Sequence, residues 1–203
     1  MRLFPLGGRL WHKNGVTSRD QHRRAPRPLD PATLQELALR YAGKYATTRA
    51  KLRAYLARKL RERGWEGATE PDLQALANRF AELGYIDDEA YALSQSRSLA
   101  ARGYGKRRLA DKLRLAGVEE GDGAAANAHA EREAVRVALR FAERRRLGPF
   151  ASGPVERPQR DKWIAAMVRA GHPFPLARSI ACMPPGGEVN PDQLSEFARS
   201  TDS

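Results

Sequence analysis

The feature that most constrains this chain is a helix ending that recurs three times. Two leucine-like residues four positions apart are followed, four positions later, by a glycine: Leu56, Leu60 and Gly64; Leu109, Leu113 and Gly117; Trp163, Met167 and Gly171. The copies begin 53 (109 − 56) and 54 (163 − 109) residues apart. One such triplet describes many helices, but three copies at nearly constant spacing indicate internal repeats.

A second similarity links the first and third repeats. The pentapeptide ALRYA at 38–42 returns as ALRFA at 138–142, and each copy is followed by one of the basic helices that carry the triplet. We therefore expect the first and third repeats to use the same kind of leading helix. Its tyrosine or phenylalanine is most simply a core residue.

Apolar spacing and capping residues predict nine helices and no strand. The predicted ranges are 31–45, 49–63, 72–83, 88–101, 106–116, 118–129, 131–147, 157–170 and 174–183. The range 118–129 is the weakest of them, because Gly121 and Gly123 reduce helix propensity. β-branched residues are scarce, so the predicted fold class is all-α.

The nine helices group into three tandem three-helix units. Their predicted ranges are 31–86, 87–130 and 131–183, preceded by a basic N-terminal arm at 1–30 and followed by a polar tail at 184–203. Units this small bury little surface alone, so neighbours must pack against each other. We expect an elongated, curved monomer.

The charge indicates an anionic partner. Formal net charge is +12 and the pI is near 10.4, which is most often associated with nucleic acid, although an arginine-rich genome gives the same bias. Cys182 is the only cysteine, which excludes an intrachain disulfide and favours a reducing compartment. No apolar stretch approaches the roughly 18 residues of a membrane span. We expect a cytoplasmic protein.

The sequence offers no constellation for catalysis. The four histidines are scattered, and no Cys/His pair has metal-ligand spacing. Acids at 87–89 begin a helix, where capping explains them. The segment RGYGKRR at 102–108 lacks the ending of a phosphate-binding loop. We expect no metal, no cofactor and no enzymatic activity.

Two basic helices supply the candidate contacts to a partner or to DNA. These candidates are Arg49, Lys51, Arg53, Arg102, Lys106, Arg107, Arg108, Lys112 and Arg114. A solvated helix face and a contact surface for DNA phosphate or an acidic protein groove both remain open. The run 106–108 favours contact, because cations at a helix start oppose the helix dipole.

Four segments together resemble the RecX family of recombination regulators. They are YATTRAKLRAYL (45–56), ELGYIDDEAYA (82–92), RGYGKRRLADKLRLAGV (102–118) and RRRLGPF (144–150), within a similarity that covers about 34–182. The chain departs from the family where its first basic helix runs one turn longer, and where 118–130 is rich in glycine and alanine.

The resemblance implies a function as well as a fold. RecX-like proteins are non-enzymatic tandem three-helix repeats. They bind the RecA recombinase, above all its filament on single-stranded DNA, and restrain filament growth, strand exchange and ATPase. The alternative is a helical DNA-binding nucleoid protein or transcription factor, although no single recognition helix stands out.

Overall fold

The computed structural model describes residues 27–199, and within them the fold is all-helical with no strand. Its elements are α1 (Pro31–Lys44), α2 (Arg49–Arg63), α3 (Leu73–Glu82), α4 (Asp88–Ala101), α5 (Lys106–Ala116), α6 (Glu120–Arg132), α7 (Ala134–Arg145), a 3-10 turn η1 (Gly148–Phe150), α8 (Arg157–Arg169), α9 (Phe174–Cys182) and α10 (Pro191–Arg199). The all-α prediction is confirmed. Most of the predicted basic arm, 1–26, lies outside the described residues.

The helix starts follow from capping side chains. Asp30, Thr48 and Asp87 each accept the backbone N–H three residues ahead, at 2.7, 3.1 and 2.7 Å. The third helix, predicted over 72–83, is capped by Asp72, which accepts two N–H groups of the first turn.

The recurring glycines end the middle helices for a backbone reason. Gly64, Gly117 and Gly171 follow the last turn of α2, α5 and α8 and have φ of 81°, 66° and 96°. Only glycine adopts this left-handed region without a steric cost. The repeat in the sequence therefore marks three helix ends that each use a glycine with positive φ.

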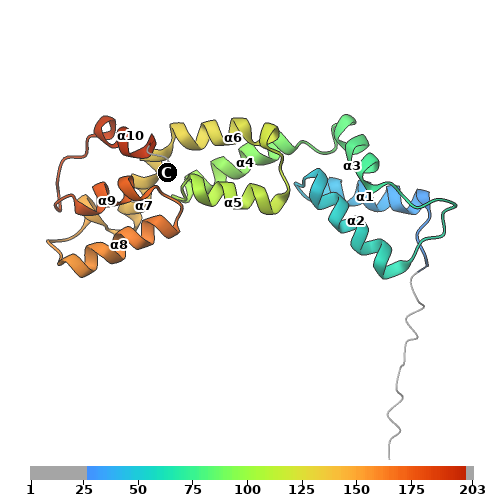
Figure 1. Cartoon of the computed structure of the whole chain (residues 1–203), viewed down its shortest axis with the longest axis horizontal. Coiled ribbons are helices and arrows are strands. Elements are labelled where there is room, and N and C mark those ends of the chain that lie inside the picture. The colour runs from blue at the N-terminus through green and yellow to red at the C-terminus, as the bar shows by residue number, and fades with distance from the viewer. Residues whose placement is uncertain (1–26, 200–203) are drawn as a thin grey trace, which may run out of the picture.

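The helices follow one another along a long axis in three groups (Figure 1), α1–α3, α4–α6 and α7–α10. Each group has its own cluster of buried hydrophobic side chains. The clusters of the second and third groups share Tyr104 at their edges, whereas the clusters of the first and second groups share no residue. The division into units 31–86, 87–130 and 131–183 stays a prediction.

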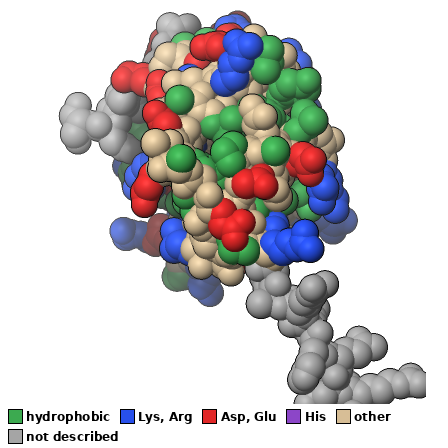
Figure 2. All heavy atoms as spheres, turned by 90° about the vertical axis from the view of Figure 1, so that its right-hand side faces the viewer, with side chains coloured by type: hydrophobic (Ala, Val, Ile, Leu, Met, Phe, Trp, Pro, Cys, Tyr) green, Lys and Arg blue, Asp and Glu red, His purple; other side chains and the backbone are tan. Residues whose placement is uncertain are grey.

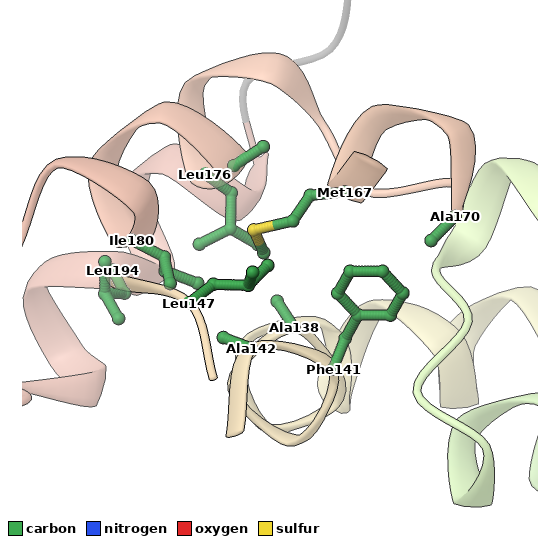
Figure 3. Close-up of a cluster of buried hydrophobic side chains, with 10 residues drawn as sticks. Ala138, Phe141, Ala142, Leu147, Met167, Ala170, Leu176, Ile180 and Leu194 are labelled. Carbon is green, nitrogen blue, oxygen red and sulfur yellow. The ribbon is translucent and has the colours of Figure 1, made fainter. Parts of the chain in front are cut away.

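The cluster of the third group is the largest. Met167 of α8 and Leu176 and Ile180 of α9 point toward Phe141 and its neighbours on α7 (Figure 3), and these aliphatic side chains are fully buried. Leu194 of α10 joins them and is 1% exposed. The polar tail predicted at 184–203 thus contains a helix that was not predicted, α10, and its Leu194 packs into this core.

The weakest predicted helix is present because small residues let it approach its neighbour closely. Ala126 of α6 is fully buried, and Gly123 of the same helix is also buried. The Ser96 hydroxyl of α4 donates to the carbonyl oxygen of Ala126 at 3.0 Å. Close packing of α4 on α6 therefore outweighs the low helix propensity of glycine.

The boundary of the predicted N-terminal arm is also corrected. Leu29 is fully buried and pairs with the turn after α2, donating to Gly64 O at 3.0 Å and accepting from Glu66 N at 2.8 Å. Trp65, which lies between them, packs against the first core and donates from Nε1 to Thr69 O at 2.8 Å. Residues from Leu29 onward thus belong to the first unit.

Polar contacts hold the junction between the first and second groups. The Thr48 hydroxyl donates to Ala116 O at 2.6 Å. Arg49 donates two hydrogen bonds to the Asp88 carboxylate, from its backbone N–H and from its Nε, both at 3.0 Å. Its Nη2 donates a third to Asp122 at 2.5 Å. The Asp88 side chain is only 4% exposed, and its hydrogen bond raises the pKa of the Arg49 guanidinium. These ion pairs position α2 against α4 and α6.

Backbone-to-backbone packing holds the junction between the second and third groups. Gly105 donates its N–H to Ala170 O at 2.9 Å, and Arg107 donates to Gly171 O at 3.2 Å. A Cβ at Gly105 would lie 2.3 Å from the Gly171 oxygen, so no side chain fits there. His172 is 3% exposed, and its Nε2 lies 3.0 Å from the carbonyl oxygen of Gly103. The two glycines let the end of α8 meet the start of α5 directly.

Acid should weaken this second junction through His172. Burial lowers the pKa of His172 from 6.5 to about 4. Between those pH values the unfolded chain binds a proton that the folded chain does not. The free energy of unfolding therefore falls as the pH drops below 6.5. Urea unfolding should show wild type losing about 2 kcal/mol more than His172→Gln between pH 7 and pH 5. Equal losses in both proteins would contradict this role.

Candidate partner-binding surface

Two of the predicted contact residues in α5 are paired with carboxylates of the chain itself. Lys106 Nζ lies 2.5 Å from Glu131 Oε1 of α6, and this hydrogen bond lowers the pKa of Glu131. Arg114 Nη2 lies 2.9 Å from Asp111, one turn back on the same helix. All four side chains are substantially exposed, so these pairs contribute little stability. They do reduce the charge available to a partner.

The predicted contacts in α2 are likewise engaged within the chain. Arg49 forms the ion pairs of the first junction described above. Lys51 donates to the Tyr91 hydroxyl at 2.5 Å, with its ammonium 4.4 Å from the ring centroid. Arg53 hydrogen-bonds the Gln74 amide of α3. The Arg49 guanidinium therefore holds the fold together, and its charge is neutralised within the chain, which corrects its prediction as a partner contact.

The remaining four predicted contacts have no carboxylate partner among the described residues. They are Arg102, Arg107, Arg108 and Lys112, on α5 and the turn before it. The three arginines are exposed and Lys112 is half-buried. Their charge is therefore not neutralised within the part of the chain that the structure describes.

The fold brings two arginines of α7 to the same place. Arg144 Nη1 donates to the carbonyl oxygen of Arg102 at 3.2 Å, and Arg140 Nη1 donates to a carbonyl oxygen at the end of α4 at 3.4 Å. Arg102 and Arg108 both lie over the ring of Tyr104, 5.6 and 5.9 Å from its centroid. We call Arg102, Arg108, Arg140 and Arg144 the junction cation cluster. None of them has an ion-pair partner among residues 27–199.

The end of α8 partly explains why cations stand at the start of α5. The carbonyl groups of Ala170 and Gly171 point at the first N–H groups of α5. The negative end of one helix dipole therefore offsets the positive end of the other. Cations at 106–108 are therefore compatible with folding alone. The lack of carboxylate partners around the junction cation cluster favours an anionic partner more strongly.

The candidate contacts predicted from the sequence include neither Arg140 nor Arg144. Both lie about forty residues from the turn they approach, so no local pattern connects them to Arg102. The one sequence feature that could have indicated this proximity is the repeat, because it places the first and third units on either side of the second. The identity of the neighbouring helix follows only from the packing.

Other kinds of site find no support in the described residues. Within 27–199 no group of three or more His, Cys, Asp or Glu side chains is arranged to hold a metal ion. None of the helices in this range is both long enough and apolar enough to span a membrane.

A family profile and a solved structure both relate this chain to RecX proteins. Residues 87–126, which span α4, α5 and the start of α6, match the family profile described as "RecX, second three-helix domain". The crystal structure of RecX from Lactobacillus salivarius has the same fold, with a TM-score of 0.53 and 19% identity over 73% of this chain and 92% of that one.

Curated sequences extend the match over most of the chain. The regulatory protein RecX of Myxococcus xanthus is 34% identical over 166 residues, which cover 76% of this chain and 87% of the relative. That of Agrobacterium fabrum is 30% identical over 140 residues, covering 67% of this chain and 74% of the relative. That of Mycobacterium sp. strain KMS is 39% identical over 97 residues, about half of each chain. This chain belongs to the RecX family.

Proposed function

We propose that this protein is a regulator of homologous recombination and DNA repair that binds the RecA recombinase and its filament on single-stranded DNA. It acts in the cytoplasm by binding, without catalysis or a cofactor. By occupying the filament it restrains filament growth, strand exchange and ATP hydrolysis. The junction cation cluster supplies the electrostatic part of the contact.

The observation that carries the proposal is the combination of family and surface. The relatives are named regulatory proteins, and the chain presents four arginines without carboxylate partners where α4, α5 and α7 meet. A filament of protein on nucleic acid offers both phosphates and acidic side chains to such a surface. Arg107 and Lys112 extend the cationic surface along α5.

The alternative function is that of a helical DNA-binding protein of the nucleoid or transcription class. The same cations would serve it, because phosphate contacts need no sequence-reading helix. The two functions differ in whether RecA is required for the protein to act. A RecA regulator acts on the assembled filament at concentrations where it leaves bare DNA free, whereas a nucleoid protein coats DNA with or without RecA.

The test is RecA-catalysed strand exchange and single-stranded-DNA-dependent ATP hydrolysis, with RecA from the same source. We expect substoichiometric protein to slow both reactions at salt and protein concentrations where single-stranded DNA alone stays unbound, as followed by fluorescence anisotropy of a labelled strand. Inhibition that appears only when the protein has saturated the bare DNA would favour the alternative. No inhibition at any ratio would contradict the proposal.

A further inference from the structure

A second surface lies between the first and second helical groups, carries aromatic rings and is separate from the junction cation cluster. The far end of the molecule, at α1–α3, mixes hydrophobic, acidic and basic side chains (Figure 2). Tyr45 and Tyr85, from the turns after α1 and α3, are 50% and 52% exposed. Tyrosines this exposed are not needed for the core, so another reason for their placement is required.

The rings are held in place by other rings. Tyr45 lies 5.3 Å from Tyr41, which stacks on Tyr55 of α2 at 4.2 Å with an interplanar angle of 13°. Tyr85 leans on the buried Phe80 at 5.5 Å. Each exposed ring is thus fixed from behind and presents its outer side to solvent, an arrangement that favours stacking with a flat partner.

Tyr45 and Tyr85 line the same hollow, which we call the tyrosine hollow. Residues 42–47 form one wall, and the turn before α4 with the first turns of α4 forms the other. Its volume is about 370 Å³, within the range of small-ligand sites. Thr47 also lines it, and the buried hydroxyl oxygen of Thr47 has no hydrogen-bond partner among the described residues. Its wall therefore includes an unused hydrogen-bonding group, which is costly to leave unpaired.

The charges around the hollow select the kind of occupant. Asp87 lines it and would repel a phosphate inside. Lys44 also lines it and lies 5.4 Å from the centroid of the Tyr45 ring. Arg58 and Lys59, which lie 5.7 and 5.9 Å from the centroid of Tyr55, both pair with Glu62 and do not line the hollow, so Lys44 is its cation. A neutral flat group is therefore compatible with the interior of the hollow, and an anion is compatible with a position beside Lys44.

We propose that the tyrosine hollow binds one unstacked base of single-stranded nucleic acid against the rings of Tyr45 and Tyr85, with the adjoining phosphate at Lys44. Aromatic rings combined with a basic path are how proteins hold single strands without reading their sequence. This site is independent of RecA binding at the junction cation cluster. It would let the protein hold a strand that leaves or enters a filament.

The test uses the full chain and no RecA. Fluorescence anisotropy at low salt compares a labelled oligothymidylate with an abasic strand of equal length. Wild type should prefer the base-containing strand by roughly tenfold, the effect of one stacked base. The double variant Tyr45→Ala/Tyr85→Ala should lose this preference and bind both strands alike. A matched control, Phe174→Ala/Phe197→Ala, removes two exposed rings of the third group and should keep the preference.

Circular dichroism checks that the double variant stays folded, as expected for half-exposed side chains. Equal affinity of wild type for both strands would overturn the proposal, as would an unchanged preference in the double variant. If the double variant instead loses only binding to the RecA filament, the hollow takes a protein segment and the nucleobase assignment is wrong. Either result leaves the proposed function standing, because that function is tested on strand exchange.

Discussion

Replacing Arg102, Arg108 and Arg144 with glutamine is expected to weaken binding to the RecA filament by roughly 100-fold. Each arginine lacks a carboxylate partner among the described residues, so its charge is free to contact an anionic partner. A charged contact contributes on the order of 1 kcal/mol, and three together give about two powers of ten. Glutamine has a similar helix propensity and keeps a polar side chain without the charge, so the fold should not change.

The matched control removes the same charge from elsewhere. Arg79, Arg114 and Arg136 each pair with a carboxylate three residues away on or beside their own helix. Their replacement by glutamine should change filament binding less than threefold, a difference of about 0.6 kcal/mol. Equal weakening by the two triple variants would mean that net charge matters and the location of the cluster does not.

Gly171→Ala should damage both stability and function, although it removes no charge. Its φ of 96° is strained for alanine, and a Cβ there would lie 2.6 Å from the backbone nitrogen of Arg108. We expect a loss of about 3 kcal/mol in the free energy of unfolding. Because α5 and α8 must separate to relieve the collision, Arg108 should also move away from Arg144, and filament binding should fall.

Urea unfolding followed by circular dichroism measures the first effect, and co-sedimentation with RecA filaments measures the second. The matched control is Gly121→Ala in α6, where an added Cβ meets nothing within 4 Å. That change should raise stability by about 0.5–1 kcal/mol and leave binding unchanged. A Gly171→Ala protein with wild-type stability would show that the glycine contact is not what holds the second junction.

The sequence predicted the helices well because their determinants are local. Asp30, Thr48 and Asp87 cap within three residues, and Gly117 reverses the chain where it stands. The missed helix α10 had local signals too. Asn190 caps it by accepting the N–H of Asp192 at 3.0 Å, and Pro191 occupies its first position. Its mostly polar composition hid the single buried leucine.

The candidate surface could not be predicted to the same degree. Which cations remain without carboxylate partners depends on pairs such as Arg49 with Asp88, 39 positions apart, and Lys106 with Glu131, 25 positions apart. Side chains that approach over such separations carry no shared local pattern. The excess of basic residues in α2 and α5 was therefore predictable from the sequence. Which of these cations pair with carboxylates of the chain, and which do not, was not predictable.

The most direct test of the central claim is co-sedimentation of wild type and the Arg102/Arg108/Arg144 variant with RecA filaments on single-stranded DNA across a salt series. Wild type should bind tightly at low salt and lose affinity steeply as salt rises. The variant should bind weakly, with a slope of log affinity against log salt that is flatter by about 0.7 for each lost phosphate contact. Identical affinities and slopes for the two proteins would show that the filament is bound through another surface.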